Sequence, residues 1–198
     1  MSSRSSPTVA VLVGSLRRDS INRKLVHALS ALAGDRLNLQ LVELGEMPMY
    51  NDDLWADPPA SVLAMKAQVD AADAVLLVTP EYNRSFSPVI KNAIDWGTRP
   101  HGQNCWEAKP AAIIGTSPGA IGTAAAQNAL KGLVTVCDMV LMGQPELYFT
   151  WKPELFDAQG HVSDERTRVF LDKWVARFSQ WIARTAAPRT HAQADAGD

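Results

Sequence analysis

Polar residues able to hold a phosphate gather near the start of the chain, where an apolar run gives way to a helical pattern. The run 9–13 ends at Gly14, and the polar side chains that follow come from Ser15, Arg17, Arg18, Ser20 and Asn22. A helix that begins here exposes first-turn N–H groups without internal partners, and its dipole favours negative charge. Hydroxyl and guanidinium groups add side-chain donors. The segment therefore predicts an anion site. The alternative is an ordinary strand–helix turn with Ser20 as N-cap.

This segment differs from two better-known phosphate motifs. A dinucleotide fingerprint needs three glycines, so that the backbone can approach a pyrophosphate, and only Gly14 is present here. A Walker A loop needs a Gly-Lys-Ser/Thr sequence, which this segment lacks. Side-chain donors in place of close backbone approach suit a terminal monophosphate, which exposes three oxygens. A mononucleotide is thus the ligand that the segment favours.

The elements that would position this segment can be located from the apolar patterning. Unbroken apolar runs predict strands buried on both faces, and they lie at 9–13, 74–78, 111–114 and, more briefly, 139–142. The segment 37–41 alternates between apolar and polar residues, which predicts an edge strand. Helical patterns separate these strands. Helices are expected over 21–32, from Pro58 or Pro59 to Val69, over 88–97 after Ser87 as N-cap, from about Gly122 to Asp138, and over 170–182 after Ser163 as cap.

The order of these elements is a strand–helix repeat, which predicts a doubly wound parallel sheet with right-handed crossovers. With the second strand at an edge, the five-stranded order 2-1-3-4-5 fits best. That order defines a flavodoxin-like α/β three-layer sandwich, whose ligand lies beyond the carboxyl ends of the first and third strands. We expect one domain over 8–185, with disordered tails at 1–7 and 186–198.

Two further loops would meet the first one at that end of the sheet. They span 79–88, where Tyr82 can supply an aromatic wall, and 115–122. Both loops are rich in residues that leave backbone donors and acceptors exposed, as the border of a flat heterocycle with a polar edge requires. Each loop alone could be a plain strand–helix connection. Three such loops at one sheet end predict a ligand site.

Composition restricts the classes of function. The chain has 198 residues, 46% hydrophobic and 20% charged, which fits one globular domain. A net charge of −2 argues against a nucleic-acid or anionic-membrane partner. No apolar run approaches the length of a membrane span, and 1–7 lacks the apolar core of a signal peptide.

The cysteines form no Cys-x-x-Cys, which predicts reduced thiols in a cytoplasmic protein. The histidines show no metal-ligand spacing, and we expect no metal site. These residues are Cys105 and Cys137, and His27, His101, His161 and His191.

The chain resembles the NAD(P)H-dependent FMN reductases, and within them the branch called chromate or quinone reductases. The resemblance spans roughly Val9 to Trp181. The motifs that carry it are Gly14-Ser15-Leu16-Arg17-x-x-Ser20-x-Asn22, Pro80-Glu81-Tyr82-Asn83 and Lys91-Asn92-Ala93-Ile94-Asp95-Trp96. It implies noncovalently bound FMN, NAD(P)H as the electron donor, and a homodimer or homotetramer with the flavin near a subunit interface.

The resemblance also implies roles for individual residues. The FMN phosphate would be held by Ser15, Arg17, Ser20 and Asn22, with Ile21 between them in the binding set. The isoalloxazine ring would be bordered by Pro80, Glu81, Tyr82 and Asn83. The pyrimidine side or the ribityl chain would be approached by Ser117, Gly119 and Gly122. Arg84 departs from the family pattern, and it would attract an anionic acceptor or form an ion pair across the interface. Arg99 would be a mouth or interface residue, or else a surface arginine at a turn.

The implied activity is an FMN-dependent oxidoreductase that uses NAD(P)H to reduce flavin, quinone or similar small acceptors by two-electron ping-pong transfer. The cofactor carries the redox chemistry, so no catalytic dyad is required, and none occurs in the motifs. The alternative is an FMN-binding electron carrier or redox-sensing module without its own NAD(P)H turnover. A carrier meets protein partners through a strongly acidic surface, which a net charge of −2 does not favour. A plain structural domain is the third possibility, and it predicts a colourless protein.

Overall fold

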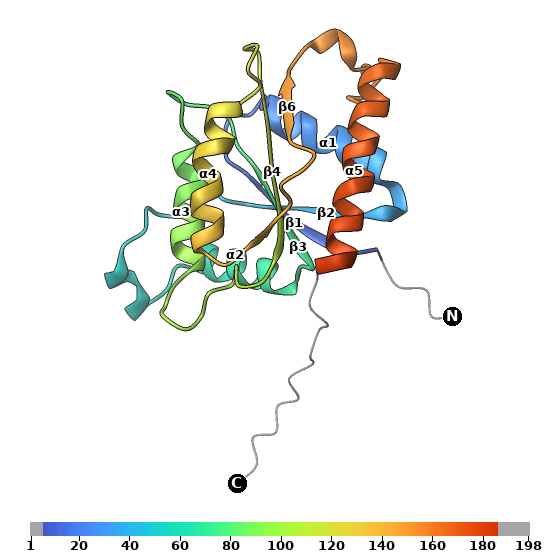
Figure 1. Cartoon of the computed structure of the whole chain (residues 1–198). Helices are drawn as coiled ribbons and strands as arrows, with labels where there is room; N and C mark the ends of the chain where they lie inside the picture. The colour runs from blue at the N-terminus through green and yellow to red at the C-terminus, as the bar shows by residue number, and fades with distance from the viewer. Residues whose placement is uncertain (1–5, 186–198) are drawn as a thin grey trace.

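The computed structural model describes residues 6–185, which form a six-stranded parallel sheet flanked by helices (Figure 1). The order is β2-β1-β3-β4-β5, with β6 also paired to β4. The predicted flavodoxin-like fold and strand order are confirmed. The strands are β1 (Thr8–Val13), β2 (Asn38–Val42), β3 (Ala74–Val78), β4 (Pro110–Ser117), β5 (Val140–Leu141) and β6 (Leu147–Thr150).

The fifth position in the sheet is divided between two short strands. Strand β5 pairs with Pro110 and Ala111 at the start of β4, and β6 pairs with the four residues from Ile114 to Ser117 at its end. Only the first of these strands was predicted from the sequence. Strand β6 matters for the site because it pairs with β4 as far as the carboxyl end of that strand.

The strand patterning follows the burial of each face. All of β3 is buried, and β1 is buried from Val9 onward, because helices cover both faces of the central sheet. Alternate residues of β1 therefore enter different cores. Ala10 and Leu12 pack into one core, whereas Val9, Val11 and Val13 pack into the other. The edge strand β2 buries only Val42, as its alternating sequence predicted.

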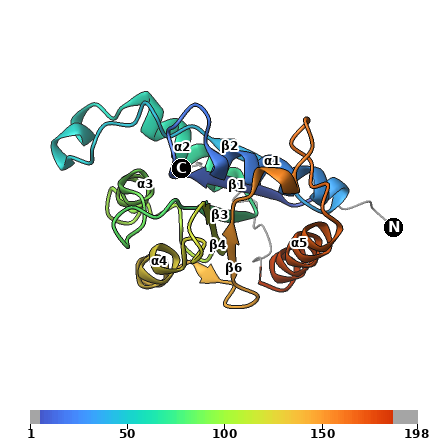
Figure 2. The same ribbon diagram turned by 90° about the horizontal axis from the view of Figure 1, so that it is seen from above.

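The helices form the outer two layers, as the view along the sheet in Figure 2 shows. One face carries α1 (Ile21–Ala33) and α5 (Glu165–Thr185). The opposite face carries α2 (Ala60–Ala71), α3 (Pro88–Gly97) and α4 (Ala124–Val136). Short 3₁₀ helices occur at η1 (Gly34–Arg36), η2 (Asp52–Ala56) and η3 (Pro153–Leu155).

The predicted helix boundaries were correct for α3 and less so elsewhere. Ser87 caps α3 by accepting a hydrogen bond from the Val89 N–H, and the helix ends at Gly97 as expected. The prediction that Ser163 caps α5 is wrong, because the Asp164 carboxylate accepts the hydrogen bond from the Thr167 N–H at 2.7 Å. Helix α4 is shorter than predicted and runs from Ala124 to Val136.

The chain ends were predicted as tails at 1–7 and 186–198. Residues 1–5 and 186–198 lie outside the described residues. Ser6 and Pro7 are described, and they are held to the domain: the Ser6 hydroxyl donates to the Asp35 carbonyl, and the Asn38 N–H donates to the Pro7 carbonyl. Within 6–185, no helix combines the length and the apolar character that crossing a bilayer requires.

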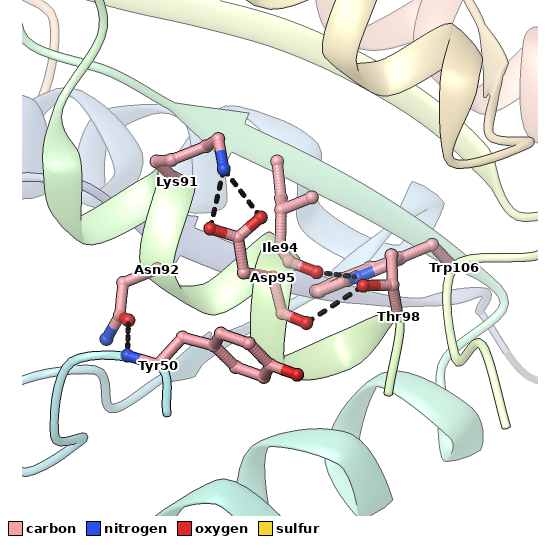
Figure 3. A network of polar contacts seen from close by, with 7 residues as sticks. All are labelled: Tyr50, Lys91, Asn92, Ile94, Asp95, Thr98 and Trp106. Atoms are coloured by element: carbon pink, nitrogen blue, oxygen red, sulfur yellow. Dashed lines mark hydrogen bonds and ion pairs between the residues drawn. The ribbon is translucent and has the colours of Figure 1, made fainter. Parts of the chain in front are cut away.

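Helix α3 is anchored along its length by polar contacts, some of which Figure 3 shows. The Asn92 carboxamide accepts from the Tyr50 N–H at 2.7 Å, and the Trp106 indole donates to the Ile94 carbonyl at 3.0 Å. Below the last turn, the buried Lys66 ammonium donates to the carbonyls of Gly97, Arg99 and Gln103. The contact with Gly97 satisfies a free carbonyl at the helix C-terminus, and the other two hold the segment that follows the helix.

The contact between Gly97 and Trp106 can be tested by substitution. A Cβ at Gly97 would lie 2.3 Å from the Trp106 ring, which is fully buried. We expect Gly97→Ala to lower the free energy of unfolding by about 1–3 kcal/mol, measured by urea denaturation, because the core is overpacked. The control is Gly132→Ala in α4, where a Cβ has nothing within 4 Å. That change is expected to raise the same free energy by about 0.5–1 kcal/mol. Equal effects of the two substitutions would contradict the packing argument.

Candidate functional site

The first loop leaves the carboxyl end of β1 in close contact with the start of α3. The Gly14 N–H donates to the Val78 carbonyl at 2.9 Å, and the Ser87 hydroxyl donates to the Gly14 carbonyl at 2.6 Å. A Cβ at Gly14 would lie 2.7 Å from the Ser87 Cβ, so only glycine permits this approach. Ser87 thus has two functions, since it caps α3 and holds the loop in place.

The backbone between Ser15 and Asn22 presents donors without acceptors. Among the described residues, no group accepts a hydrogen bond from the N–H groups of 15–22. Ser15 is 4% exposed, and its hydroxyl also makes no hydrogen bond within 6–185. Ser20 caps α1 by accepting from the Arg23 N–H at 3.3 Å. Because unpaired N–H groups at a helix N-terminus attract anions, this loop fits a phosphate.

The charged residues of this loop face solvent. Arg17 and Arg18 are exposed, and neither forms an ion pair with another described residue. Ile21 is half-buried. Because its side chain is apolar, it can contribute to the donor array only through its backbone N–H. The arginines can therefore turn toward an anion without breaking an existing contact. That Arg17 binds the phosphate stays a prediction.

Asn22 joins the first loop to the end of β4. Its carboxamide oxygen accepts from the Thr116 N–H at 2.9 Å, and its nitrogen donates to the Thr116 carbonyl at 3.1 Å. Asn22 is 2% exposed, and Thr116 is 1% exposed. The side chain thus replaces a strand partner for Thr116 on the β3 side of β4, where the pairing ends at Ile114. Asn22 fixes the spacing between two loops of the site, and one of its amide hydrogens is left for a ligand.

The loop after β3 contains a tight turn at Tyr82–Ser85. These two residues exchange backbone hydrogen bonds of 2.9 and 3.0 Å, and the central residues Asn83 and Arg84 have φ of 49° and 66°. Positive φ at both central positions is typical of a type I′ turn. Tyr82 is 44% exposed at the base of this turn. Its predicted use as an aromatic wall is compatible with this exposure.

Glu81 connects the same loop to α4. One carboxylate oxygen accepts from the N–H groups of Ala125 and Ala126 at 3.1 and 3.2 Å. Thr123, at the N-cap position of α4, accepts from the Gln127 side chain and makes no capping bond to the helix backbone, so Glu81 takes over the capping. The other carboxylate oxygen lies 3.3 Å from the Arg84 guanidinium. Glu81 therefore holds the loop after β3 against the loop after β4.

The loop after β4 is folded onto β6. The Thr150 hydroxyl donates to the Gly119 carbonyl at 3.2 Å, and Gly122 has a φ of 51°. A Cβ at Gly122 would lie 2.6 Å from the backbone of Tyr148 and Phe149, so this position requires glycine. Ser117, Gly119 and their neighbours up to Gly122 thus form a fixed border at the sheet end.

The structure brings most of the predicted site residues together and separates one of them. The sets around Ser15, Pro80 and Ser117 occupy loops at the same carboxyl end of the sheet (Figure 1). Arg84 lies on the tight turn with its side chain 76% exposed. Arg99 follows the C-terminus of α3, at the other end of the sheet, so within one chain it is not at the mouth. Its alternative role in a subunit contact stays a prediction.

Two features of the site were missed by the sequence reasoning. Thr116 and Thr150 use backbone and hydroxyl groups to connect the loops, yet neither was predicted as a site residue. Ser87 was predicted only as a helix cap. No sequence signal identifies Thr150, because its relevance depends on β6. The polar residue Thr116 at the end of an apolar run was the one available hint for that position.

The arrangement can bind and orient a ligand, but it contains no activated nucleophile. Burial raises the pKa of the Cys105 thiol to about 12, and it also raises the pKa of Cys137, so both thiols stay protonated near neutral pH. No cluster of three or more His, Cys, Asp or Glu side chains suited to a metal occurs within 6–185. The chemistry available to these loops is hydrogen bonding and electrostatic stabilisation of a bound molecule.

Comparison with known proteins gave consistent matches. The family model described as NADPH-dependent FMN reductase matches residues 7–152. A 2-hydroxy-1,4-benzoquinone reductase from a Burkholderia species is 48% identical over 174 residues, which cover 88% of this chain and 95% of that protein. A quinone reductase from Pseudomonas putida is 46% identical over 176 residues, covering 88% and 94%. The solved structure of the flavoenzyme NAD(P)H:acceptor oxidoreductase FerB from Paracoccus denitrificans has a TM-score of 0.90 and 53% identity, covering 91% of this chain and all of that one.

The capping role of Glu81 leads to a prediction for α4. We expect Glu81→Ala to lower the free energy of unfolding by about 1–2 kcal/mol, because two N–H groups lose a charged acceptor. Hydrogen exchange at Ala125 and Ala126 should accelerate in parallel. The exposed Glu107, which has no side-chain partner among the described residues, gives the control Glu107→Ala. That control should change stability by less than about 0.5 kcal/mol. Unchanged exchange at both alanines in the Glu81 variant would contradict the capping role.

Proposed function

Because this chain belongs to the NADPH-dependent FMN reductase family, we propose that it binds FMN across the three loops and uses NAD(P)H to reduce a small quinone. Its relatives named as quinone reductases support this choice of acceptor. Flavins and similar small molecules are further acceptors of the same class. The electron-carrier alternative is less well supported, because those relatives are named as enzymes in their own right.

The observation that carries this proposal is the unpaired donor array at 15–22. A phosphomonoester supplies acceptors for several N–H groups at once, and the Ser15 hydroxyl adds a buried donor at the same place. The array has no pair of additional glycines to admit a pyrophosphate. Among nucleotide cofactors it therefore fits the terminal phosphate of FMN.

The other two loops support the proposal at the ring end of the cofactor. The backbone N–H groups of Gly119, Ala120 and Ile121 have no acceptors within the described chain. They can donate to the polar edge of the isoalloxazine ring and stabilise negative charge there. Pro80, Glu81, Tyr82 and Asn83 would border the ring from the other loop. Glu81 contributes mainly by holding that loop to α4.

In this reaction the chain binds and orients while the cofactor performs the electron transfer. Bound FMN would supply two-electron redox chemistry between NAD(P)H and the acceptor. The fixed loops would place the electron donor and then the acceptor at the same open face of the flavin ring. This alternation gives ping-pong kinetics, and the positioning would supply most of the rate acceleration. No side chain has to exchange a proton with the substrate.

We further propose that the protein is a cytoplasmic homodimer or homotetramer. Large exposed apolar side chains support self-association, since Met49 is 72% exposed and Val136 is 79% exposed. Arg84 and Arg99 would then serve as interface residues, with Arg84 also available to attract an anionic acceptor. Light scattering of the purified protein gives the oligomeric state directly.

The activity is tested with the purified protein. We expect a yellow protein with a flavin absorption spectrum that bleaches when NADPH is added without oxygen. NADPH oxidation should then become rapid on addition of menadione. A carrier would show the flavin spectrum with negligible NADPH oxidation, and a structural domain would be colourless. Either of the latter outcomes contradicts the proposed function.

The role of Arg17 gives a sharper prediction. Loss of one charge-assisted hydrogen bond to phosphate removes about 1.5–3 kcal/mol. Arg17→Ala should therefore weaken FMN binding about tenfold to a hundredfold in a fluorescence titration, with the melting temperature of the apoprotein unchanged. Arg184→Ala, at an exposed position in the last turn of α5 and so at the opposite end of the sheet from the loops, is the control and should leave FMN affinity unaltered. Unchanged affinity in the Arg17 variant would exclude it as a phosphate ligand.

A further inference from the structure

A pocket lies where the end of the first loop and the first turns of α1 face the segment between β6 and α5. Its volume is about 550 Å³, within the usual range for small-molecule sites. One wall is the N-terminal half of α1, and the other is the segment between β6 and α5, which Figure 2 shows lying beside that helix. Of the FMN-binding residues implied by the resemblance, the pocket shares only Ser20, although Arg18 of the same loop also lines it. No residue of the loops after β3 and β4 lines it.

The wall formed by α1 is basic. Ser20, Arg23, Lys24 and His27 recur at helical spacing along one stripe, and Arg18 lies above them. Arg23 pairs with Glu43 at 3.1 Å and Lys24 with Asp19 at 2.5 Å, and both acidic side chains are more than 70% exposed. Exposed ion pairs of this kind contribute little to stability. An anionic ligand can therefore take over these two cations at small cost, and Arg18 has no competing ion pair in the described chain.

The opposite wall is aromatic and pre-formed. The rings of Trp151 and Phe156 stack with centroids 4.2 Å apart and an interplanar angle of 13°. The Trp151 N–H donates to the Ser117 carbonyl at 2.9 Å, which fixes this wall to the end of β4. The Asp157 carboxylate accepts from the N–H groups of Gln159 and His161 at 2.9 and 2.8 Å, so the rim is an ordered turn.

The two walls also touch at the lower end of the pocket. The His27 ring nitrogen lies 3.1 Å from the Gln159 carbonyl oxygen, and the His27 and His161 rings are stacked with centroids 5.7 Å apart. A Cβ at Gly160 would lie 3.2 Å from the His27 ring, so this closure depends on glycine. The cavity is thus bounded by contacts within the described chain, and it is not a gap between loosely placed segments.

From these two walls we propose that the pocket binds an aromatic phosphomonoester of nucleotide size, separate from FMN. The phosphate would lie against Arg18, Arg23 and Lys24, and the apolar ring system against Trp151 and Phe156. Charge and aromatic surface are both required, because either alone would favour simpler ligands. Such a group occurs in the adenosine portion of NADPH and in free mononucleotides, and these two sources share the chemistry that the pocket recognises.

The binding test uses the FMN-saturated protein, so that the probe cannot occupy the flavin phosphate site. Titration calorimetry with 5′-AMP should show saturable binding. Adenosine, which lacks the phosphate, and inorganic phosphate, which lacks the ring, should each bind at least about tenfold more weakly. Absence of 5′-AMP binding at millimolar concentration overturns the proposal, whether or not the protein reduces quinones.

Two variants locate the binding. Lys24→Glu reverses a charge in the wall, and Ala158→Trp fills the cavity from an exposed position on the rim. Each should weaken 5′-AMP binding by about tenfold or more while leaving the flavin spectrum unchanged. Lys173→Glu on α5 makes the same charge change at an exposed position outside the pocket and should have little effect. If both pocket variants bind 5′-AMP as the unmodified protein does, the proposal is wrong.

Steady-state kinetics separate the two sources of the ligand. If the pocket receives the adenosine end of NADPH, 5′-AMP competes with NADPH, and Lys24→Glu raises the KM for NADPH with little change in kcat. If the ligand is a free mononucleotide, 5′-AMP still binds at the pocket but leaves the KM for NADPH unchanged. Both outcomes support the site and differ only in its occupant. Neither outcome depends on which quinone is the acceptor. A failure of the proposed quinone reduction can therefore be distinguished from a failure of the proposed 5′-AMP site.

Discussion

The site depends on the pair of hydrogen bonds between the Asn22 carboxamide and the backbone of Thr116. These residues are 94 positions apart in the sequence and are both almost fully buried. A buried amide that loses its partner is destabilising by about 1–3 kcal/mol, so this contact has little freedom to lengthen. It sets how far the N-terminus of α1 lies from the end of β4. The distance between the N–H groups of 15–22 and the loop after β4 follows from that spacing.

The remaining loops are joined by the same kind of contact, in which a side chain satisfies the backbone of a neighbouring loop. The Ser87 hydroxyl donates to the Gly14 carbonyl, and the Glu81 carboxylate accepts from the first turn of α4. Two groups of backbone donors in the described chain are left without acceptors beside these cross-links, namely the N–H groups of 15–22 and those of 119–121. The side-chain contacts hold the loops in place, and the unpaired N–H groups are what the loops can offer to a ligand.

Much of the fold could be predicted from the sequence because its strongest signals are local. Apolar runs such as 74–78 identify central strands, the alternation at 37–41 identifies the edge, and Ser87-Pro88 marks a helix start. Strand β6 was missed, because Leu147–Thr150 is short and its pairing is set by the vacant edge beside the end of β4. The partners of Glu81 and Asn22 were missed for a related reason. The sequence shows that a carboxylate or an amide requires hydrogen-bond partners, but it does not show which distant segment of the fold supplies them. Arg99 was predicted as a mouth or interface residue, or else a surface arginine; the direction of α3 carries it to the far end of the sheet, so within one chain it is not at the mouth.

Net charge describes this molecule less well than the distribution of its charges. The chain as a whole carries −2, yet Arg17, Arg18, Arg23 and Lys24 stand within eight consecutive positions at the positive end of α1. Cations so close together raise the local potential at the helix N-terminus, where the unpaired N–H groups already favour anions. Their acidic neighbours Asp19 and Glu43 are exposed and screened by salt, so they offset this potential only in part. A phosphate approaching this end of the protein therefore meets a basic surface, whereas a large anionic polymer meets that surface only over a small patch. This local concentration of charge would let a weakly acidic protein bind small phosphorylated ligands, as proposed, without favouring a long anionic polymer.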